Sequence, residues 1–478
     1  MFDLGIEVQY LMSIGQDRVP REILAQIFLS CLPRRPIDHK QPDLKISPMT
    51  LCHICSYWRN VALGTPRLWN SLHHISYAST EVEDKDVFRY GIRPIDIEFL
   101  RWWAMNISPL PPTLHLDIQR RDGIGLHRSE TDVAESNHEF FLGLLASAQC
   151  LALGHIVRNA LVCNAYPLVS PNLQSLLILD GPFTLEDIYL SDLCTHPDQI
   201  YNKLYIEGLF IEDLNFGKEL PWTYLTHVCI AMRINPPIWV HFMKKLSNLQ
   251  CGVFHLHFLE DAPPILSDTT LPHLRRLSVN VGGKFQPGFI ASLFKGLTFP
   301  ALTGFRLSTS YSSTSHLSIE ELHELLRAAP ALTELHILCE FPSDSDPDDD
   351  EEMIPFPAGV DPLSLIIPNL EFLVIEIFQL EFLYREWREK LINSSWLNLK
   401  SEHNRIKTVV FFLSPKLGYN HIMHSIETHL AELQIDGVNL ILSWLNLSPH
   451  DFFPSRFHLK QGFMHWDERN FFLEHTTQ

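Results

Sequence analysis

The stretch Pro272-His273-Leu274-Arg275-Arg276-Leu277-Ser278-Val279 decides the fold, because variants of it recur along the second half of the chain. The recurring unit is a proline, a leucine two residues later, and then a run in which apolar residues alternate. Further copies begin at Pro171, Leu225 (without the proline), Pro300, Pro330 and Pro368. Alternation over four to six residues is typical of a half-buried strand, so each copy predicts one strand.

The spacing of these copies indicates a repeat protein. Leucines at 225, 249, 274, 302 and 332 lie 24, 25, 28 and 30 residues apart. Leucine-rich repeats, which pair one strand with a helix or turn, have periods of about 20–29 residues. The chain resembles irregular leucine-rich repeats in this respect, although it lacks the asparagine or cysteine that usually closes their consensus. A non-solenoid α/β domain is the alternative.

The segments before several strands have helical patterns. Ser318 and Glu321 form a capping-box arrangement at the start of a helix predicted to end near Ala329. Segments 239–243 and 289–294 also predict helices. The unit therefore consists of a helix, a Pro-x-Leu turn and a strand. A stack of such units predicts a solenoid with parallel strands on one face and helices on the other, in the α+β to α/β class.

Residues 78–170 are predicted to connect the N-terminal part of the chain to residues 171–478, and to hold atypical first repeats. A helix is expected around Phe99–Trp103 and a strand over 113–118. Residues 123–137 are polar and predict a loop, and 140–153 predict a helix followed by a strand.

Two short amphipathic helices are predicted upstream of the repeats. Pro20 suits a helix start, and the apolar residues that follow have helical spacing until Pro33 ends the pattern. A second helix is predicted to run from Ser47-Pro48 through Ala62, with Gly64 as its C-terminal cap. About sixty residues are too few for a large independent core, so a module of this size often relies on a partner or on the next domain.

These residues resemble an F-box. The matching blocks are Pro20-Arg21-Glu22-Ile23-Leu24-Ala25-Gln26-Ile27-Phe28, Ile54-Cys55-Ser56-Tyr57-Trp58-Arg59 and Pro66-Arg67-Leu68-Trp69. The similarity is greatest to the F-box-like form of mushroom-forming fungi, in which Cys-Leu-Pro follows the first helix, as Cys31-Leu32-Pro33 does here. Val19 replaces the usual leucine before the proline. The expected boundaries are a segment 1–16, an F-box-like domain 17–77, the connecting region 78–170 and a repeat domain 171–478.

The resemblance implies a function and a set of binding residues. An F-box binds the Skp-type adaptor of a cullin–RING ubiquitin ligase, and the rest of the chain recruits a protein substrate. Carried onto this sequence, the residues expected to bind the adaptor are Pro20, Ile23, Leu24, Ile27, Phe28, Leu32, Ile54, Cys55 and Trp58. The alternative is that most of them form the core of the small helical module.

Charge and composition argue against several other classes. Lys and Arg number 37 and Asp and Glu 56, which gives a net charge of −19. Residues 1–80 hold eight basic and six acidic residues, so the remainder carries −21. Such a chain is not expected to bind nucleic acid in a sequence-independent way, or to bind anionic membranes. No apolar run has the length of a membrane span, and the first residues lack a signal-peptide pattern, so a cytoplasmic or nuclear location is expected.

Metal sites are not expected. Nine unclustered cysteines favour reduced thiols, and Cys52-x-x-Cys55 lacks the second pair that a zinc site needs. His255 and His257 would share a strand face, but no further ligands are apparent. Asp344–Glu352 holds seven acids in nine residues within the insertion 342–358. It lacks the glycine and the glutamate of a calcium loop, and predicts a solvated insertion.

Catalysis is not expected either. The sequence has no phosphate-binding glycine loop, Gly-x-Ser-x-Gly or His-Glu-x-x-His motif. The expected function is therefore that of a non-enzymatic F-box adaptor without a cofactor. The alternatives are an interaction scaffold with a degenerate F-box and, less favoured, a hydrolase or metal enzyme in the α/β part.

Overall fold

The computed structural model describes fifteen parts of the chain. These are residues 19–31, 48–78, 94–107, 109–120, 135–154, 170–178, 201–211, 220, 222–258, 268–283, 293–311, 327–340, 369–377, 407–413 and 439–444. The chain divides into two compact units. The first comprises Met1–Tyr201, Gly217–Leu220 and Arg469–Gln478, and the second comprises Asn202–Phe216 and Pro221–Glu468.

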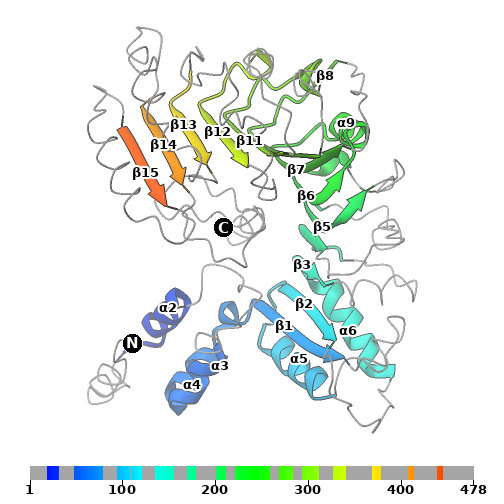
Figure 1. The fold of residues 1–478 in the computed structure, drawn as a ribbon. Helices are drawn as coiled ribbons and strands as arrows, with labels where there is room; N and C mark the ends of the chain where they lie inside the picture. Colours follow the sequence, from blue (N-terminus) through cyan, green and yellow to red (C-terminus); the bar gives the residue numbers. More distant parts are fainter. Residues whose placement is uncertain are drawn as a thin grey trace, which may run out of the picture. The chain divides into compact units, whose positions relative to one another are not determined.

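The first unit begins with helices and continues into parallel strands (Figure 1). Its elements are α2 (Arg21–Cys31), α3 (Pro48–Ile54), α4 (Ser56–Leu63), η3 (Pro66–Leu68), β1 (Ser71–Ala78), α5 (Pro94–Ile107), β2 (Thr113–Arg120), α6 (Glu135–Ser147), β3 (Cys150–Leu153) and β4 (Ser175–Ile178). The strands pair in chain order, β1-β2-β3-β4, and each pair is parallel. Helices α5 and α6 each connect one strand to the next.

The second unit is a longer series of parallel strands (Figure 1). Its elements are β5 (Lys203–Ile211), η6 (Trp222–Tyr224), β6 (His227–Ile234), α9 (Pro236–Lys245), β7 (Cys251–Phe258), β8 (Thr269–Thr270), β9 (Arg276–Gly283), β10 (Leu297–Thr298), β11 (Gly304–Tyr311), β12 (Glu334–Glu340), β13 (Phe372–Ile377), β14 (Thr408–Leu413) and β15 (Asn439–Trp444). Apart from the small parallel pair β8 and β10, each strand is parallel to the next strand in the sheet.

The strand order confirms a parallel-strand solenoid. Each new strand is added beside the one before it, as a stack of repeats requires, and the chain is not wound back between earlier strands. The non-solenoid alternative is therefore wrong for the described sheet. The predicted strands at 171–179, 225–230, 272–279, 300–307, 330–337 and 368–375 correspond to β4, β6, β9, β11, β12 and β13.

The leucine of each unit has a common structural role. Leu274, Leu302 and Leu332 are at most 1% exposed, and each donates its backbone N–H to the carbonyl three residues earlier. The next residue then bonds to the matching residue of the preceding unit: the N–H of Thr303 donates to the Arg275 carbonyl at 2.9 Å, and that of Thr333 to Thr303 at 2.9 Å. The turn is thus fixed by a buried leucine and by a backbone ladder that continues the sheet.

One face of the sheet and the connecting helices form the core of the second unit. Leu277, Phe305, Leu335 and Leu373 lie side by side in register, and all are fully buried. Trp239 of α9 packs against Phe254 of β7 with ring centroids 6.1 Å apart. Helix α9 therefore covers the Phe254 side of the sheet, and confirms the helix predicted at 239–243.

The other sequence-based helices agree with the structure where it describes them. Residues 293–294 and 327–328 are helical at the ends of the segments predicted as helices, and the remainder of those segments, including Ser318 and Glu321, lies outside the described residues. The predictions for 99–103, 113–118 and 140–153 are confirmed by α5, β2, α6 and β3. The loop predicted for 123–137 is too long at its end, because 135–137 already belong to α6.

The second N-terminal helix differs from its prediction. It is not continuous from 48 to 62 but consists of α3 and α4, which are separated at Cys55. Cys55 is extended (φ −158°, ψ 171°), and its Sγ accepts a hydrogen bond from the Trp58 N–H at 3.4 Å. The thiol therefore caps α4, and this local bond replaces the backbone bonds of a continuous helix. Gly64 is the C-terminal cap, as predicted.

No helix within the described part of the chain is long and apolar enough to cross a membrane.

Candidate functional site

Helix α2 has two apolar faces. Leu24 and Phe28, four residues apart, are 4% and 0% exposed and face the interior of the first unit. Ile23 and Ile27 are 53% and 47% exposed, and Val19, just before the helix, is 36% exposed. Residues four apart lie above one another on a helix, so Ile23 and Ile27 share one side of α2. We call these two residues, together with Val19 just before the helix, the α2 stripe.

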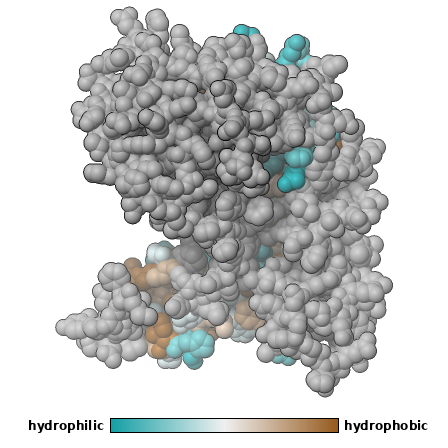
Figure 2. Space-filling model, viewed as in Figure 1, coloured by the Kyte–Doolittle hydropathy of each residue, from teal (hydrophilic) through white to brown (hydrophobic). Residues whose placement is uncertain are grey.

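The α2 stripe is unusual for this structure. The exposed large hydrophobic residues among the described positions are Val19, Ile23, Ile27, Met105 and Tyr224. Two of these five lie on one side of α2 and a third, Val19, directly precedes the helix, whereas single exposed apolar residues are common on any protein. Figure 2 shows hydrophobic surface gathered over the N-terminal helices. Contiguous apolar surface of this kind marks interaction sites.

Aromatic packing holds α2 against α4. The rings of Phe28 and Trp58 have centroids 4.9 Å apart, with planes inclined by 55°. The hydroxyl of Tyr57 donates a hydrogen bond to the Val19 carbonyl at 2.7 Å, which fixes the chain just before α2. Pro20 is exposed, and its carbonyl accepts the first helical bond from the Leu24 N–H at 3.0 Å. The α2 stripe is therefore presented on a helix whose other face is packed.

A short polar link connects α3 to α4 across the break. The Arg59 side chain donates from Nε to the Cys52 carbonyl at 2.8 Å, and satisfies a carbonyl that the interrupted helix leaves without its usual partner. Cys52 itself is buried, and burial raises the pKa of its thiol, with a smaller opposing effect of the Arg59 charge. Such a thiol is poorly suited to metal binding at neutral pH.

Two tryptophans join the helices to the first strands. Trp69 is fully buried, and its Nε1–H donates to the Ala62 carbonyl at the end of α4 at 2.8 Å. Trp103 of α5 donates from its own Nε1 to the Trp69 carbonyl at 2.7 Å, and the two rings are 5.0 Å apart. The Pro66-Arg67-Leu68-Trp69 block of the sequence thus forms the connection between the small helical segment and the α5–β2 region.

The nine residues expected to bind the adaptor fall into three groups. Ile23, Ile27 and Pro20 are exposed, Ile54, Cys55 and Trp58 are half-buried, and Leu24 and Phe28 are core residues. Leu32 lies outside the described residues. Leu24 and Trp58 therefore do not share one open surface. Val19 is an exposed residue of the α2 stripe that was not among the nine expected residues. Its position four residues before Ile23 can be read from the sequence.

Metal-ligating groups are not clustered in the described part of the chain, where no three His, Cys, Asp or Glu side chains could hold one ion. His255 and His257 lie on one face of β7, as the alternation predicts. The insertion 342–358 and the segment 1–16 lie outside the described residues.

The sequence was compared with models of known protein families and with curated proteins, and neither comparison finds a match.

Proposed function

We propose that residues 17–77 are an F-box-like module that binds the Skp-type adaptor of a cullin–RING ubiquitin ligase, and that the repeats, as an irregular leucine-rich-repeat-like domain, bind a protein substrate. The α2 stripe is the observation that carries the proposal. Its position on the first helix of the block Pro-x-Glu-Ile-Leu-x-x-Ile-Phe is where an F-box would present apolar side chains to its adaptor.

The split between exposed and buried residues refines the proposed binding surface. Ile23 and Ile27 are the primary contacts, with Val19 and Pro20 beside them. Leu24 and Phe28 shape the surface from beneath by packing α2 against α4, and Trp58 supports Phe28. In a module this small, core and interface residues are neighbours on the same helix, so both groups matter to binding for different reasons.

The proposed mechanism is proximity. The helical module would hold the ligase, the repeats would hold a target protein, and ubiquitin transfer would take place on other subunits. The proposal therefore assigns no catalytic residue and no cofactor to this chain. It names two partners, the Skp-type adaptor and a protein substrate. It includes neither nucleic acid nor a membrane as a partner.

The decisive experiment is binding of the full chain to a purified Skp-type adaptor, measured by pull-down and by calorimetry. The variant Ile23→Asp/Ile27→Asp places two charges on the α2 stripe, and should weaken binding at least about thirtyfold, as expected for loss of central apolar contacts. Both residues are about half exposed, so the variant should still fold, which circular dichroism verifies.

The matched control is Met105→Asp. Met105 is 70% exposed on α5, so the substitution adds the same charge to another exposed apolar helix residue. Adaptor binding should be unchanged in this variant. Absence of binding by the unaltered chain would refute the adaptor function and favour the alternative, an interaction scaffold with a degenerate F-box. Equal losses in both variants would show that α2 is not the binding surface.

A further inference from the structure

Five basic residues lie on three adjacent strands of the second unit. Strands β6, β7 and β9 carry His227, Arg233, His255, His257 and Arg276, and their sequences contain no aspartate or glutamate. This is notable in a chain in which acidic residues outnumber Lys and Arg by 56 to 37. We call these five residues the basic strand face.

The five residues share one side of the sheet. On β7, Phe254 and Leu256 are buried and Phe254 faces α9, so His255 and His257 point to the opposite side. On β9, Leu277 and Val279 are fully buried, which places Arg276 on that same opposite side. His227 precedes the buried Val228, and Arg233 precedes the buried Ile234 and is level with His255.

An irregularity in β6 shifts the position of Arg233 within this group. The register between β6 and β7 shifts between Ile230 and Arg233, so Arg233 pairs with His255, whereas regular pairing would place it beside His257. Arg233 remains close enough to His257 for its charge to lower the pKa of that histidine, in addition to the larger lowering effect of burial. His257 is therefore largely neutral at pH 7, and Arg233 and Arg276 supply the permanent charge of the face.

The side chains of the basic strand face are accessible. Arg233 is exposed, and His227, His255, His257 and Arg276 are half-buried. Within the described residues, neither Arg233 nor Arg276 takes part in an ion pair. Arg276 has a different neighbour: burial raises the pKa of the Cys251 thiol, and the Arg276 charge partly opposes this.

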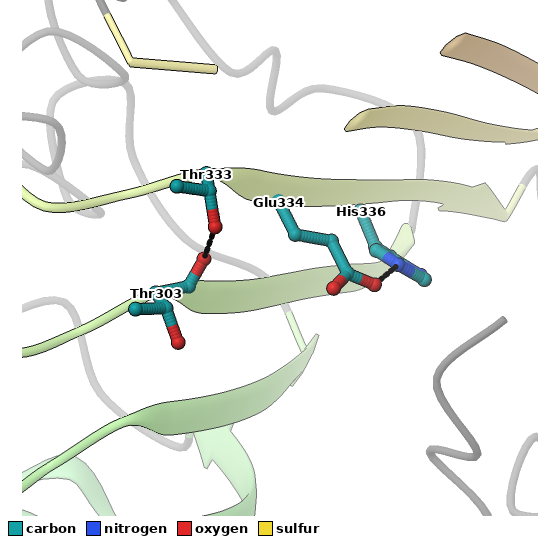
Figure 3. A network of polar contacts seen from close by, with 4 residues as sticks. All are labelled: Thr303, Thr333, Glu334 and His336. Carbon is teal, nitrogen blue, oxygen red and sulfur yellow. Dashed lines mark hydrogen bonds and ion pairs between the residues drawn. The ribbon is translucent and has the colours of Figure 1, made fainter. Parts of the chain in front are cut away.

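Strand β11, the next strand beside β9, carries Arg306 on the same side of the sheet, level with Ser278, but Arg306 is only 4% exposed. On β12, beyond β11, the Glu334 carboxylate and the His336 ring are 2.8 Å apart (Figure 3). Among the described strands of the second unit, the exposed or half-buried basic residues thus lie on β6, β7 and β9, which span about 10 Å if adjacent strands are about 4.8 Å apart.

We propose that the basic strand face binds an extended segment of a protein rich in aspartate and glutamate. Charge complementarity selects an acidic partner. The spacing favours an extended one, because Arg276 and Arg233, level with Cys251 and His255 of β7, lie four residues apart along the strands, about 13 Å at 3.3 Å per residue. The two arginines lie on β6 and β9, on either side of β7, and do not converge on one point, which fits separate carboxylates.

This inference extends the proposed function by naming a substrate class. It rests on the proposed function only in assuming that the acidic segment belongs to a ubiquitination target. Binding of the segment itself requires no adaptor.

The test measures binding of the full chain to a fluorescent peptide of alternating glutamate and alanine by anisotropy. A peptide with glutamine in place of glutamate is the neutral control. The chain should bind the glutamate peptide and not the glutamine peptide, and the affinity should fall as salt rises. The variant Arg233→Ala/Arg276→Ala should lose about tenfold in affinity, and Arg233→Lys/Arg276→Lys should retain most of it.

The matched control is Arg275→Ala/Lys244→Ala, which removes the same net charge from two exposed positions outside the basic strand face. It should bind like the unaltered chain. Failure to bind the glutamate peptide would overturn the inference, as would an equal loss in the control variant. Equally tight binding of a single-stranded oligonucleotide, lost in the same variant, would identify a nucleic-acid surface and also overturn it.

The two proposals can fail separately. Peptide binding without adaptor binding would refute the adaptor function alone, and adaptor binding without peptide binding would refute the basic strand face alone.

Discussion

The ring of Phe28 on α2 packs against the ring of Trp58 on α4, with centroids 4.9 Å apart. This contact fixes which side of α2 faces inward. Phe28 is fully buried while Ile27, the residue before it, is 47% exposed. Two neighbouring apolar residues on one helix therefore have different roles, one in folding and one on the surface.

We expect Phe28→Ala to destabilise the helical segment by about 3–5 kcal/mol, because it removes a fully buried aromatic side chain and leaves a cavity beside Trp58. Ile27→Ala should cost less than about 1 kcal/mol, since the side chain is half exposed. Denaturant unfolding followed by tryptophan fluorescence and circular dichroism measures both. Similar losses in the two variants would mean that both faces of α2 are packed.

Trp103→Phe tests the connection between the helices and the strands. The change keeps an aromatic ring near Trp69 but removes the Nε1–H that bonds to the buried Trp69 carbonyl. We expect a loss of about 1–3 kcal/mol in the free energy of unfolding, because a buried carbonyl is left unsatisfied.

Trp102→Phe is the control for this substitution. Trp102 also packs against Trp69 with ring centroids 5.0 Å apart, but it is only half-buried, and its ring N–H has no hydrogen-bond partner in the described part of the chain. Its loss should be clearly smaller. An equal or greater loss for Trp102→Phe would show that ring packing, and not the hydrogen bond, stabilises the connection.

Much of the fold follows from the sequence. The Pro-x-Leu copies predict six of the strands because their period-2 pattern and the buried leucine are both local signals. The break at Cys55 was not predictable in this way. Apolar residues continue at helical spacing from Leu51 to Ala62, and only the hydrogen bond from Trp58 N–H to the Cys55 thiol distinguishes two helices from one.

The candidate sites were predictable only in part. The apolar residues of α2 cover a wide part of the helix surface and comprise Ile23, Leu24, Ile27 and Phe28. Periodicity alone does not show which of them face the core. The contact between Phe28 and Trp58 shows that the side with Phe28 faces inward. The shared face of His255 and His257 follows from alternation. The pairing of Arg233 with His255, in place of His257, depends on the irregularity in β6, which no residue pattern signals.

Cysteine reactivity should follow burial. Cys251 is buried, and desolvation raises the pKa of its thiol far above the ordinary value of 9.0, so almost no thiolate forms in the folded protein at pH 7–9. Cys31, at the end of α2, is exposed. We expect iodoacetamide to label Cys31 in the native protein and Cys251 only after unfolding, as measured by peptide mass spectrometry. Rapid native labelling of Cys251 at pH 8 would contradict this burial.

The last prediction concerns the hydrogen bonds between neighbouring repeats. Thr333 donates both its backbone N–H, at 2.9 Å, and its hydroxyl, at 3.1 Å, to the carbonyl of Thr303. Figure 3 shows the bond from the hydroxyl. Thr303 repeats the hydroxyl bond to the Arg275 carbonyl at 3.1 Å. Thr333→Val keeps the shape and the backbone bond but removes the hydroxyl, so a loss of about 0.5–1 kcal/mol is expected.

Thr333→Ser is the matched control, because it keeps the hydroxyl and removes only a methyl group. The denaturant midpoint should therefore fall further for Thr333→Val than for Thr333→Ser, and Thr303→Val should behave like Thr333→Val. If the serine variant is the less stable one, the methyl contact outweighs the hydrogen bond. The threonines would then contribute to the stack by packing, and the ladder would depend on backbone groups alone.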